Sequence, residues 1–139
     1  MSENKLVVTK VIKAAPEEVF EAFTDPEIMA EWFFGAEDWS VEVSNTLEIG
    51  GKYFLNMIAT DGKEYKHTGE YKIIAPPEKL VFTWNSDFAQ DTVVTVYFHK
   101  VADGTEITLE HEFLPTDEAR ENHRKGWTTC LNNLEKLFA

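Results

Sequence analysis

The sequence predicts an α+β fold in which a curved antiparallel sheet of about six to seven strands wraps around one long C-terminal helix. Apolar and polar residues alternate from about Trp39 to Phe113, as in strands that bury one face. A helical pattern of about 22 residues then closes the chain. Because the apolar face of the sheet needs a cover, and only this helix is long enough, we expect residues 1–139 to form a single domain.

The chain is expected to open with one strand and two short helices. Residues 5–13 (KLVVTKVIK) are rich in β-branched side chains, which favour a strand. Pro16 suits the first turn of a helix, and the acidic residues after it face the positive end of the helix dipole. Asp25 and Pro26 repeat this start signal, and Gly35 is expected to end the second helix.

Turn residues divide the long alternating region into strands. Asp61-Gly62 and Asp103-Gly104 are hairpin signals, and two prolines at positions 76 and 77 separate two further strands. Two strands are expected to turn one face each toward the core, formed by Tyr65, His67, Gly69, Tyr71 and Ile73 in the first and by Ile107, Leu109, His111 and Phe113 in the second.

The closing helix is predicted to start near Pro115, with Thr116 or Asp117 as its N-cap. Its apolar stripe consists of His123, Trp127, Cys130, Leu134, Leu137 and Phe138. Gly126 lies beside this stripe, although a glycine inside a helix costs about 1 kcal/mol relative to alanine. We expect it either to let the helix approach the sheet closely or to leave room for a ligand.

The composition narrows the classes of partner. A formal net charge of −12 argues against nucleic acid and anionic membranes, both of which bind through Lys and Arg. No segment approaches the roughly 20 apolar residues of a membrane span, and the first residues lack the apolar run of a signal peptide. A single cysteine, Cys130, allows no internal disulfide. We therefore expect a cytoplasmic protein, either a monomer or a weak homodimer.

Six segments in a fixed order resemble a known family. They are PEEVFEAFTDPEIMAEWF, IGGKYFLNM, DGKEYKHTGEY, PPEKLVFTW, EITLEHEF and HRKGWTTCLNNLEKL. Together they are similar to the START-like, helix-grip (SRPBCC) superfamily and, within it, to the C-terminal domain of the Hsp90 ATPase activator (AHSA1-like). The Gly-Trp pair followed by a Leu-x-x-Leu spacing is the most specific of these signals.

The resemblance implies a curved sheet gripping the C-terminal helix, often with a pocket between them. Proteins of this fold bind lipids, sterols and aromatic polyketides, act as cyclases, or serve as chaperone accessories, so the fold does not fix the function. The eukaryotic activator also has a separate N-terminal domain that engages the chaperone, whereas this chain begins directly at the helix-grip domain. We therefore place ligand binding, in a stress-related role and with a lipid or polyketide as the ligand, ahead of chaperone activation.

Eight inward-facing side chains are expected to line the pocket: Trp32, Met57, Tyr65, His67, Trp84, His111, His123 and Trp127. Aromatic rings provide contact area, and a few polar groups fix the orientation of a ligand. The alternative is a packed core whose histidines bond to neighbours. The predicted partner is an apolar or aromatic small molecule. The alternatives are a chaperone (Hsp90-type) partner or a cyclase- or aldolase-like enzyme in which His67 moves protons with Tyr65 or His111.

Other chemistry has little support in the sequence. No H-x₃-H or HExxH spacing is present and His99 faces outward, so we expect neither a metal nor a cofactor. Cys130 lies at the centre of the apolar stripe, which indicates burial and not a reactive thiolate. No G-x-S-x-G elbow or phosphate-binding glycine loop occurs, and we expect no catalytic residue.

Overall fold

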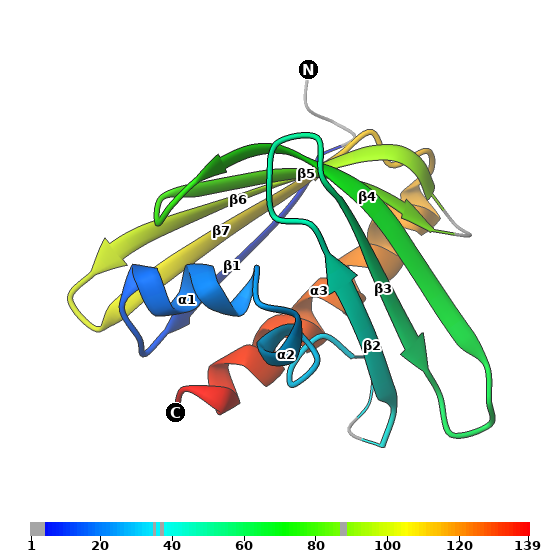
Figure 1. Ribbon diagram of the computed structural model, residues 1–139, viewed down its shortest axis with the longest axis horizontal. Helices are drawn as coiled ribbons and strands as arrows, with labels where there is room; N and C mark the ends of the chain where they lie inside the picture. The colour runs from blue at the N-terminus through cyan, green and yellow to red at the C-terminus, as the bar shows by residue number, and fades with distance from the viewer. Residues whose placement is uncertain (1–4, 35, 37, 87–88) are drawn as a thin grey trace.

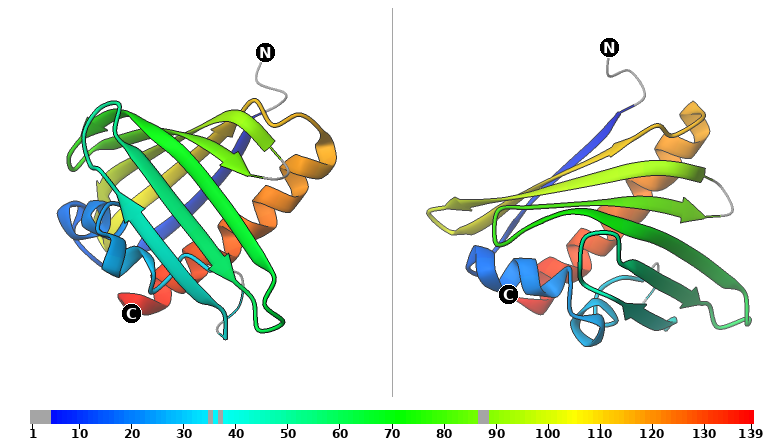
Figure 2. Two further views of the ribbon diagram at one scale, coloured as in Figure 1. Left: turned by 45° about the vertical axis from the view of Figure 1, so that its right-hand side comes forward. Right: turned by 45° about the horizontal axis from the view of Figure 1, so that its top comes forward.

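The computed structural model describes residues 5–34, 36, 38–86 and 89–139. It contains a seven-stranded antiparallel sheet in the order β1-β7-β6-β5-β4-β3-β2, which arches over one long helix (Figures 1 and 2). This confirms the predicted fold class. The elements are β1 (Leu6–Ile12), α1 (Pro16–Ala22), α2 (Pro26–Met29), β2 (Ser40–Asn45), β3 (Lys52–Ile58), β4 (Glu64–Ala75), β5 (Lys79–Ser86), β6 (Ala89–Val101), β7 (Gly104–Glu112) and α3 (Asp117–Leu137).

Helix α3 begins at the predicted place. Of the two expected N-caps, Thr116 is the one used: its hydroxyl oxygen accepts from the backbone N–H of Ala119 at 3.0 Å. The buried residues of the helix are Ala119, Trp127, Cys130, Leu131 and Leu134. The predicted stripe is therefore wrong at Leu137, which lies in the last turn and is exposed. It also omits Leu131, which is buried.

Two predicted inward positions on the sheet are also wrong. The register between β4 and β5 shifts between Tyr71 and Ile73, and this irregularity leaves Ile73 42% exposed while Ile74 packs on the core. Phe113 follows the last residue of β7, has a φ of 70°, and is 64% exposed. In both places a local backbone feature breaks the alternation that the sequence pattern assumes. The expected helix end at Gly35 lies outside the described residues.

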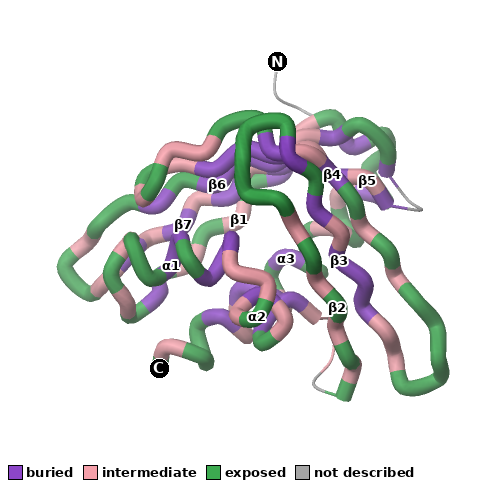
Figure 3. Tube along the Cα trace, in the orientation of Figure 1, coloured by how far each residue is buried: buried purple, intermediate pink, exposed green. Residues whose placement is uncertain are grey.

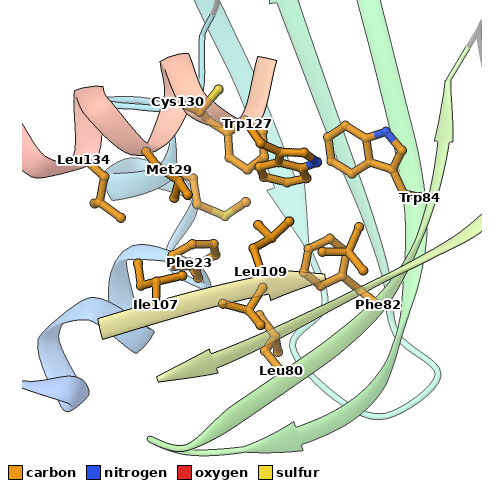
Figure 4. Close-up of a cluster of buried hydrophobic side chains, with 14 of the residues drawn as sticks. Phe23, Met29, Leu80, Phe82, Trp84, Ile107, Leu109, Trp127, Cys130 and Leu134 are labelled. Carbon is orange, nitrogen blue, oxygen red and sulfur yellow. The ribbon is translucent and has the colours of Figure 1, made fainter. Parts of the chain in front are cut away.

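The core fills the space between the concave face of the sheet and the buried side of α3. Figure 4 shows Leu80, Phe82 and Leu109 from the sheet meeting Trp127 and Leu134 from the helix. In Figure 3 the buried segments lie along these facing surfaces, whereas the hairpin connections are exposed. Within the described part of the chain, no helix is long and apolar enough to cross a membrane.

The two halves of α3 have different surroundings. The helix packs along β1, where the ammonium of Lys10 donates to Asn132 Oδ1 at 2.8 Å and lies 2.9 Å from a carboxylate oxygen of Glu135. Helix α1 packs against β6 and β7, with the Phe20 ring on that of Phe98 at 5.2 Å, whereas α2 packs against β2. Strands β2 to β4 lie at the other side of the sheet, far from β1 in the strand order. The candidate site lies under that side.

Candidate functional site

A cavity of about 360 Å³ lies between the N-terminal half of α3 and strands β3 to β5. The β4 and β5 side chains reach it because Tyr65, His67 and Trp84 all point to the concave face. Helix α3 provides the opposite wall through residues three and four positions apart. Asn122 and Gly126 in this wall are exposed, so the cavity opens to solvent beside them.

Six of the eight predicted site residues line this cavity: Met57, Tyr65, His67, Trp84, His123 and Trp127. The other two do not. Trp32 is fully buried in the core, where its ring stacks on Phe33 at 4.7 Å and its indole N–H donates to the carbonyl of Ala22 at 2.9 Å. His111 is fully buried behind Trp127. Both face inward as expected, but neither borders the cavity.

Sequence reasoning missed other lining residues, among them Phe33, Trp39, Ser86 and Asn122. Two of them carried a usable signal. Ser86 continues the inward alternation of β5 beyond Trp84, and Asn122 lies four residues before Gly126 on one side of the helix. Trp39 precedes β2, and its ring stacks nearly parallel on that of Tyr65 at 5.2 Å. No local pattern predicts that contact, because it joins distant parts of the chain.

A chain of hydrogen bonds holds His111 in one neutral form. The indole N–H of Trp127 donates to His111 Nδ1 at 3.1 Å, so that nitrogen carries a lone pair. Thr92 donates its hydroxyl proton to the carbonyl of Trp84 at 2.7 Å. Its oxygen must therefore accept from His111 Nε2, 2.8 Å away. Burial lowers the pKa of His111 to about 3, in agreement with a neutral ring whose task is to hold Trp127.

His123 is also fixed by its backbone partner. Its Nδ1 lies 2.7 Å from the carbonyl oxygen of Ala119, which can only accept, so Nδ1 carries the proton. In the neutral ring, Nε2 therefore keeps its lone pair. The hydrogen bond to Ala119 raises the pKa of His123, but burial has the larger effect and lowers it. The net result favours the neutral form of the ring.

Trp84 is at the centre of the aromatic lining. Its ring lies 4.7 Å from that of His67 and 5.0 Å from that of Trp127. Only 4% of the residue is exposed, and its indole N–H has no hydrogen-bond partner among the described residues. Figure 4 shows the ring nitrogen on the edge turned away from Leu109 and Phe82. Leaving such a donor buried without a partner costs about 1–3 kcal/mol.

Two residues of α3 limit what the cavity can do. Cys130 is buried, and this burial raises the pKa of its thiol to about 12, so it is not a nucleophile at neutral pH. A Cβ atom at Gly126 would meet nothing within 4 Å. The expectation that Gly126 permits close approach to the sheet is therefore wrong. The other alternative agrees with the structure, since Gly126 borders open space in the cavity.

The described lining contains no Asp, Glu, Lys or Arg. The described residues also contain no group of three or more His, Cys, Asp or Glu side chains arranged to hold a metal ion. The site thus combines aromatic rings with a few neutral polar groups. This combination suits binding of an uncharged, apolar molecule.

Residues 13–139 match the family model described as Activator of Hsp90 ATPase homolog 1-like protein. The chain belongs to this family. All the residues that line the cavity fall within the matched region of this AHSA1-like chain. A comparison with curated proteins gave no match.

Solved structures share the fold of this AHSA1-like chain over nearly its whole length. Protein CV1439 from Chromobacterium violaceum is 26% identical, with a TM-score of 0.88 over 97% of this chain and 96% of the other. The AHSA1 (SPO3351) protein from Silicibacter pomeroyi is 24% identical, with a TM-score of 0.80 over 96% of each chain. An AHSA1-like protein from Aeromonas hydrophila is 23% identical, with a TM-score of 0.80 over 96% and 93%.

Proposed function

We propose that this protein binds an apolar, largely aromatic small molecule in the cavity between the sheet and α3. The observation that carries the proposal is a hollow of about 360 Å³ among aromatic rings that the core side chains leave unfilled. Ligand pockets typically measure about 300–1,000 Å³ and are lined mainly by apolar and aromatic groups. Since an apolar cavity of about 150 Å³ accepts benzene, this one has room for about two fused rings.

The arrangement of the lining supports binding because its rings are held in place before a ligand arrives. Trp127 is fixed by its hydrogen bond to His111, and Trp84 packs between the rings of His67 and Trp127. Side chains that are already ordered lose little conformational entropy on binding. A preorganised aromatic pocket therefore favours affinity for a flat, rigid ligand.

An enzymatic role receives less support. His111 has both ring nitrogens engaged within the protein, so it has no free position for proton transfer to a substrate. The raised thiol pKa of Cys130 argues against covalent catalysis. A role as a chaperone accessory rests on the family match, and its test is a change in the ATPase rate of purified Hsp90 when this protein is added.

The decisive experiment uses a variant in which a larger side chain on α3 fills the cavity. Gly126→Leu should fold normally, because a Cβ at this position contacts nothing, while its side chain occupies space in the cavity. We expect wild-type protein to bind two-ring aromatic compounds such as naphthalene, 2-naphthol and indole in isothermal titration calorimetry. Gly126→Leu should bind them at least about tenfold more weakly, because the leucine side chain occupies the space in which the ligand would bury its apolar surface.

The matched control is Thr128→Leu, which adds the same side chain to an exposed position on α3 outside the cavity. It should bind the panel as the wild type does. Circular dichroism and urea unfolding establish that both variants fold. Equal affinities of Gly126→Leu and wild type, or no binding of any compound by the wild type, would contradict the proposal.

A further inference from the structure

The described lining of the cavity contains no ionised partner for a charged ligand. Its described lining includes neither basic nor acidic side chains, and His123 is neutral because burial lowers its pKa. An anion placed there would lose its hydration without gaining a counter-charge, which is strongly unfavourable. The net charge of −12 on the chain adds to this penalty.

One side chain of the lining carries a buried hydrogen-bond donor that has no partner among the described residues. The indole N–H of Trp84 is buried in the lining, and the described residues provide no acceptor for it. An oxygen atom on a ligand would supply that acceptor. Because the donor is already removed from water, the bond forms with little further desolvation of the protein.

The cavity also offers an acceptor. With Nδ1 donating to Ala119, the neutral ring of His123 presents a lone pair at Nε2, and none of the described hydrogen bonds uses it. The rings of Trp84 and His123 are 6.5 Å apart between centroids. These two residues therefore adjoin each other in the lining, and a hydroxyl group that bridges two polar atoms spans up to nearly 6 Å between them, because each hydrogen bond is about 2.9 Å long.

We infer that the ligand is a neutral aromatic molecule that carries a hydroxyl group. The hydroxyl oxygen accepts from the indole N–H of Trp84, and its proton is donated to Nε2 of His123. The aromatic body of the ligand lies among the rings of the lining. This inference rests on the proposed function and narrows it, because it predicts weaker binding of carboxylates such as fatty acids and of purely hydrocarbon ligands.

The test compares ligands that share one ring system. Naphthalene has no polar group, 2-methoxynaphthalene has an acceptor oxygen only, 2-naphthol has an acceptor and a proton, and 2-naphthoate is an anion at neutral pH. Affinities are measured by isothermal titration calorimetry on the wild-type chain. We expect 2-naphthol to bind about fivefold more tightly than naphthalene, with 2-methoxynaphthalene between them. We expect 2-naphthoate to bind at least about tenfold more weakly than 2-naphthol.

Two variants assign the hydrogen bonds to their residues. Trp84→Phe removes the donor and His123→Phe removes the acceptor, and each keeps an aromatic ring. Both should reduce the preference for 2-naphthol over naphthalene toward one. In His123→Phe, 2-naphthol and 2-methoxynaphthalene should bind equally. The control Tyr97→Phe removes a hydroxyl from an exposed ring on β6 outside the cavity, and it should keep the wild-type preference.

The outcomes separate this inference from the proposed function. If none of the four compounds binds, the proposed function fails and this inference fails with it. If they bind with equal affinities, or if 2-naphthoate binds most tightly, only the hydroxyl assignment is overturned. Unchanged preference in folded Trp84→Phe and His123→Phe overturns it as well. Because the ligand comparison on the wild type is decisive alone, a variant that fails to fold does not block the test.

Discussion

The buried neutral state of His111 makes a specific prediction about stability at low pH. The ring is fully buried, Nδ1 accepts from Trp127, and Nε2 donates to Thr92. Protonation would place an N–H on Nδ1 against the N–H of Trp127. Its cross-strand neighbours are Leu6 on β1 and Val94 on β6, and the titratable group facing it from α3 is His123 at 5.0 Å between centroids.

Proton linkage gives the size of the expected loss in the free energy of unfolding. The pKa of His111 is about 3 in the folded protein and 6.5 in a model peptide, so below pH 6.5 the unfolded chain binds more protons than the folded one. The free energy of unfolding must then fall as the pH falls, by about 1.4 kcal/mol per pH unit for this group. At about pH 5 the loss amounts to about 2 kcal/mol relative to neutral pH.

The assay compares urea unfolding of the wild type and of His111→Gln at several values between about pH 7 and pH 5. Glutamine keeps a donor and an acceptor but does not titrate. We expect the variant to be about 1–3 kcal/mol less stable at neutral pH, because the hydrogen bonds to Trp127 and Thr92 are distorted. The difference should shrink by about 2 kcal/mol toward pH 5, because only the wild type bears the penalty of His111.

The comparison isolates His111, because His123 and all carboxylates are present in both proteins. His99→Gln is the control, since His99 is exposed on β6. The free energy of unfolding of this variant should change with pH as that of the wild type does. If the stabilities of wild type and His111→Gln change in parallel over this pH range, His111 is not held neutral and the hydrogen-bond assignment is refuted.

Two further predictions concern packing and the attachment of α3. Gly69→Ala would place a Cβ 2.0 Å from the carbonyl oxygen of Thr83, so we expect urea unfolding to show a free energy of unfolding lower by about 3 kcal/mol or more. At Gly126 a Cβ meets nothing within 4 Å, so Gly126→Ala should instead raise this free energy by up to about 1 kcal/mol. Equal effects of the two substitutions would refute the reasoning. Lys10→Met breaks the contacts with Asn132 and Glu135 and should cost about 0.5–1 kcal/mol in low salt and less in high salt, because Glu135 is half exposed; a cost that does not depend on salt would contradict an ionic contribution.

Most of the fold was accessible from the sequence because its signals are local and agree with each other. Asp61-Gly62 and Asp103-Gly104 occur at hairpins between antiparallel strands, and Thr116 caps α3. The errors arose where the backbone departs from regular geometry. The register shift beside Ile73 has no clear signal in the amino-acid pattern, since it results from how neighbouring strands fit together, and the pattern gives no sign of the positive φ of Phe113 either.

The candidate site was predicted less completely, and for a different physical reason. Alternation and helical spacing say which face a side chain occupies, and this was enough to select His67, Trp84 and Trp127. They do not say how closely the opposite layer approaches at that point. Trp32 and His111 occupy the expected inward face, but there the layers meet and the side chains are packed. The depth of the space depends on sheet curvature and on the path of α3, which are properties of the whole fold.

The remaining question is why the cavity persists, since protein interiors are close-packed and an apolar void forfeits dispersion contacts. The structure suggests that the lining is prevented from collapsing. Both ring nitrogens of His111 are engaged within the protein, and its hydrogen bond with Trp127 fixes the orientation of the indole ring. A collapse of the lining would break this bond. Trp84 is packed against Trp127, and Gly126 contributes no side chain that could fill the gap. The helix weakness at Gly126 and the buried polar chain at His111 therefore have a common consequence, which is a space held open for a ligand.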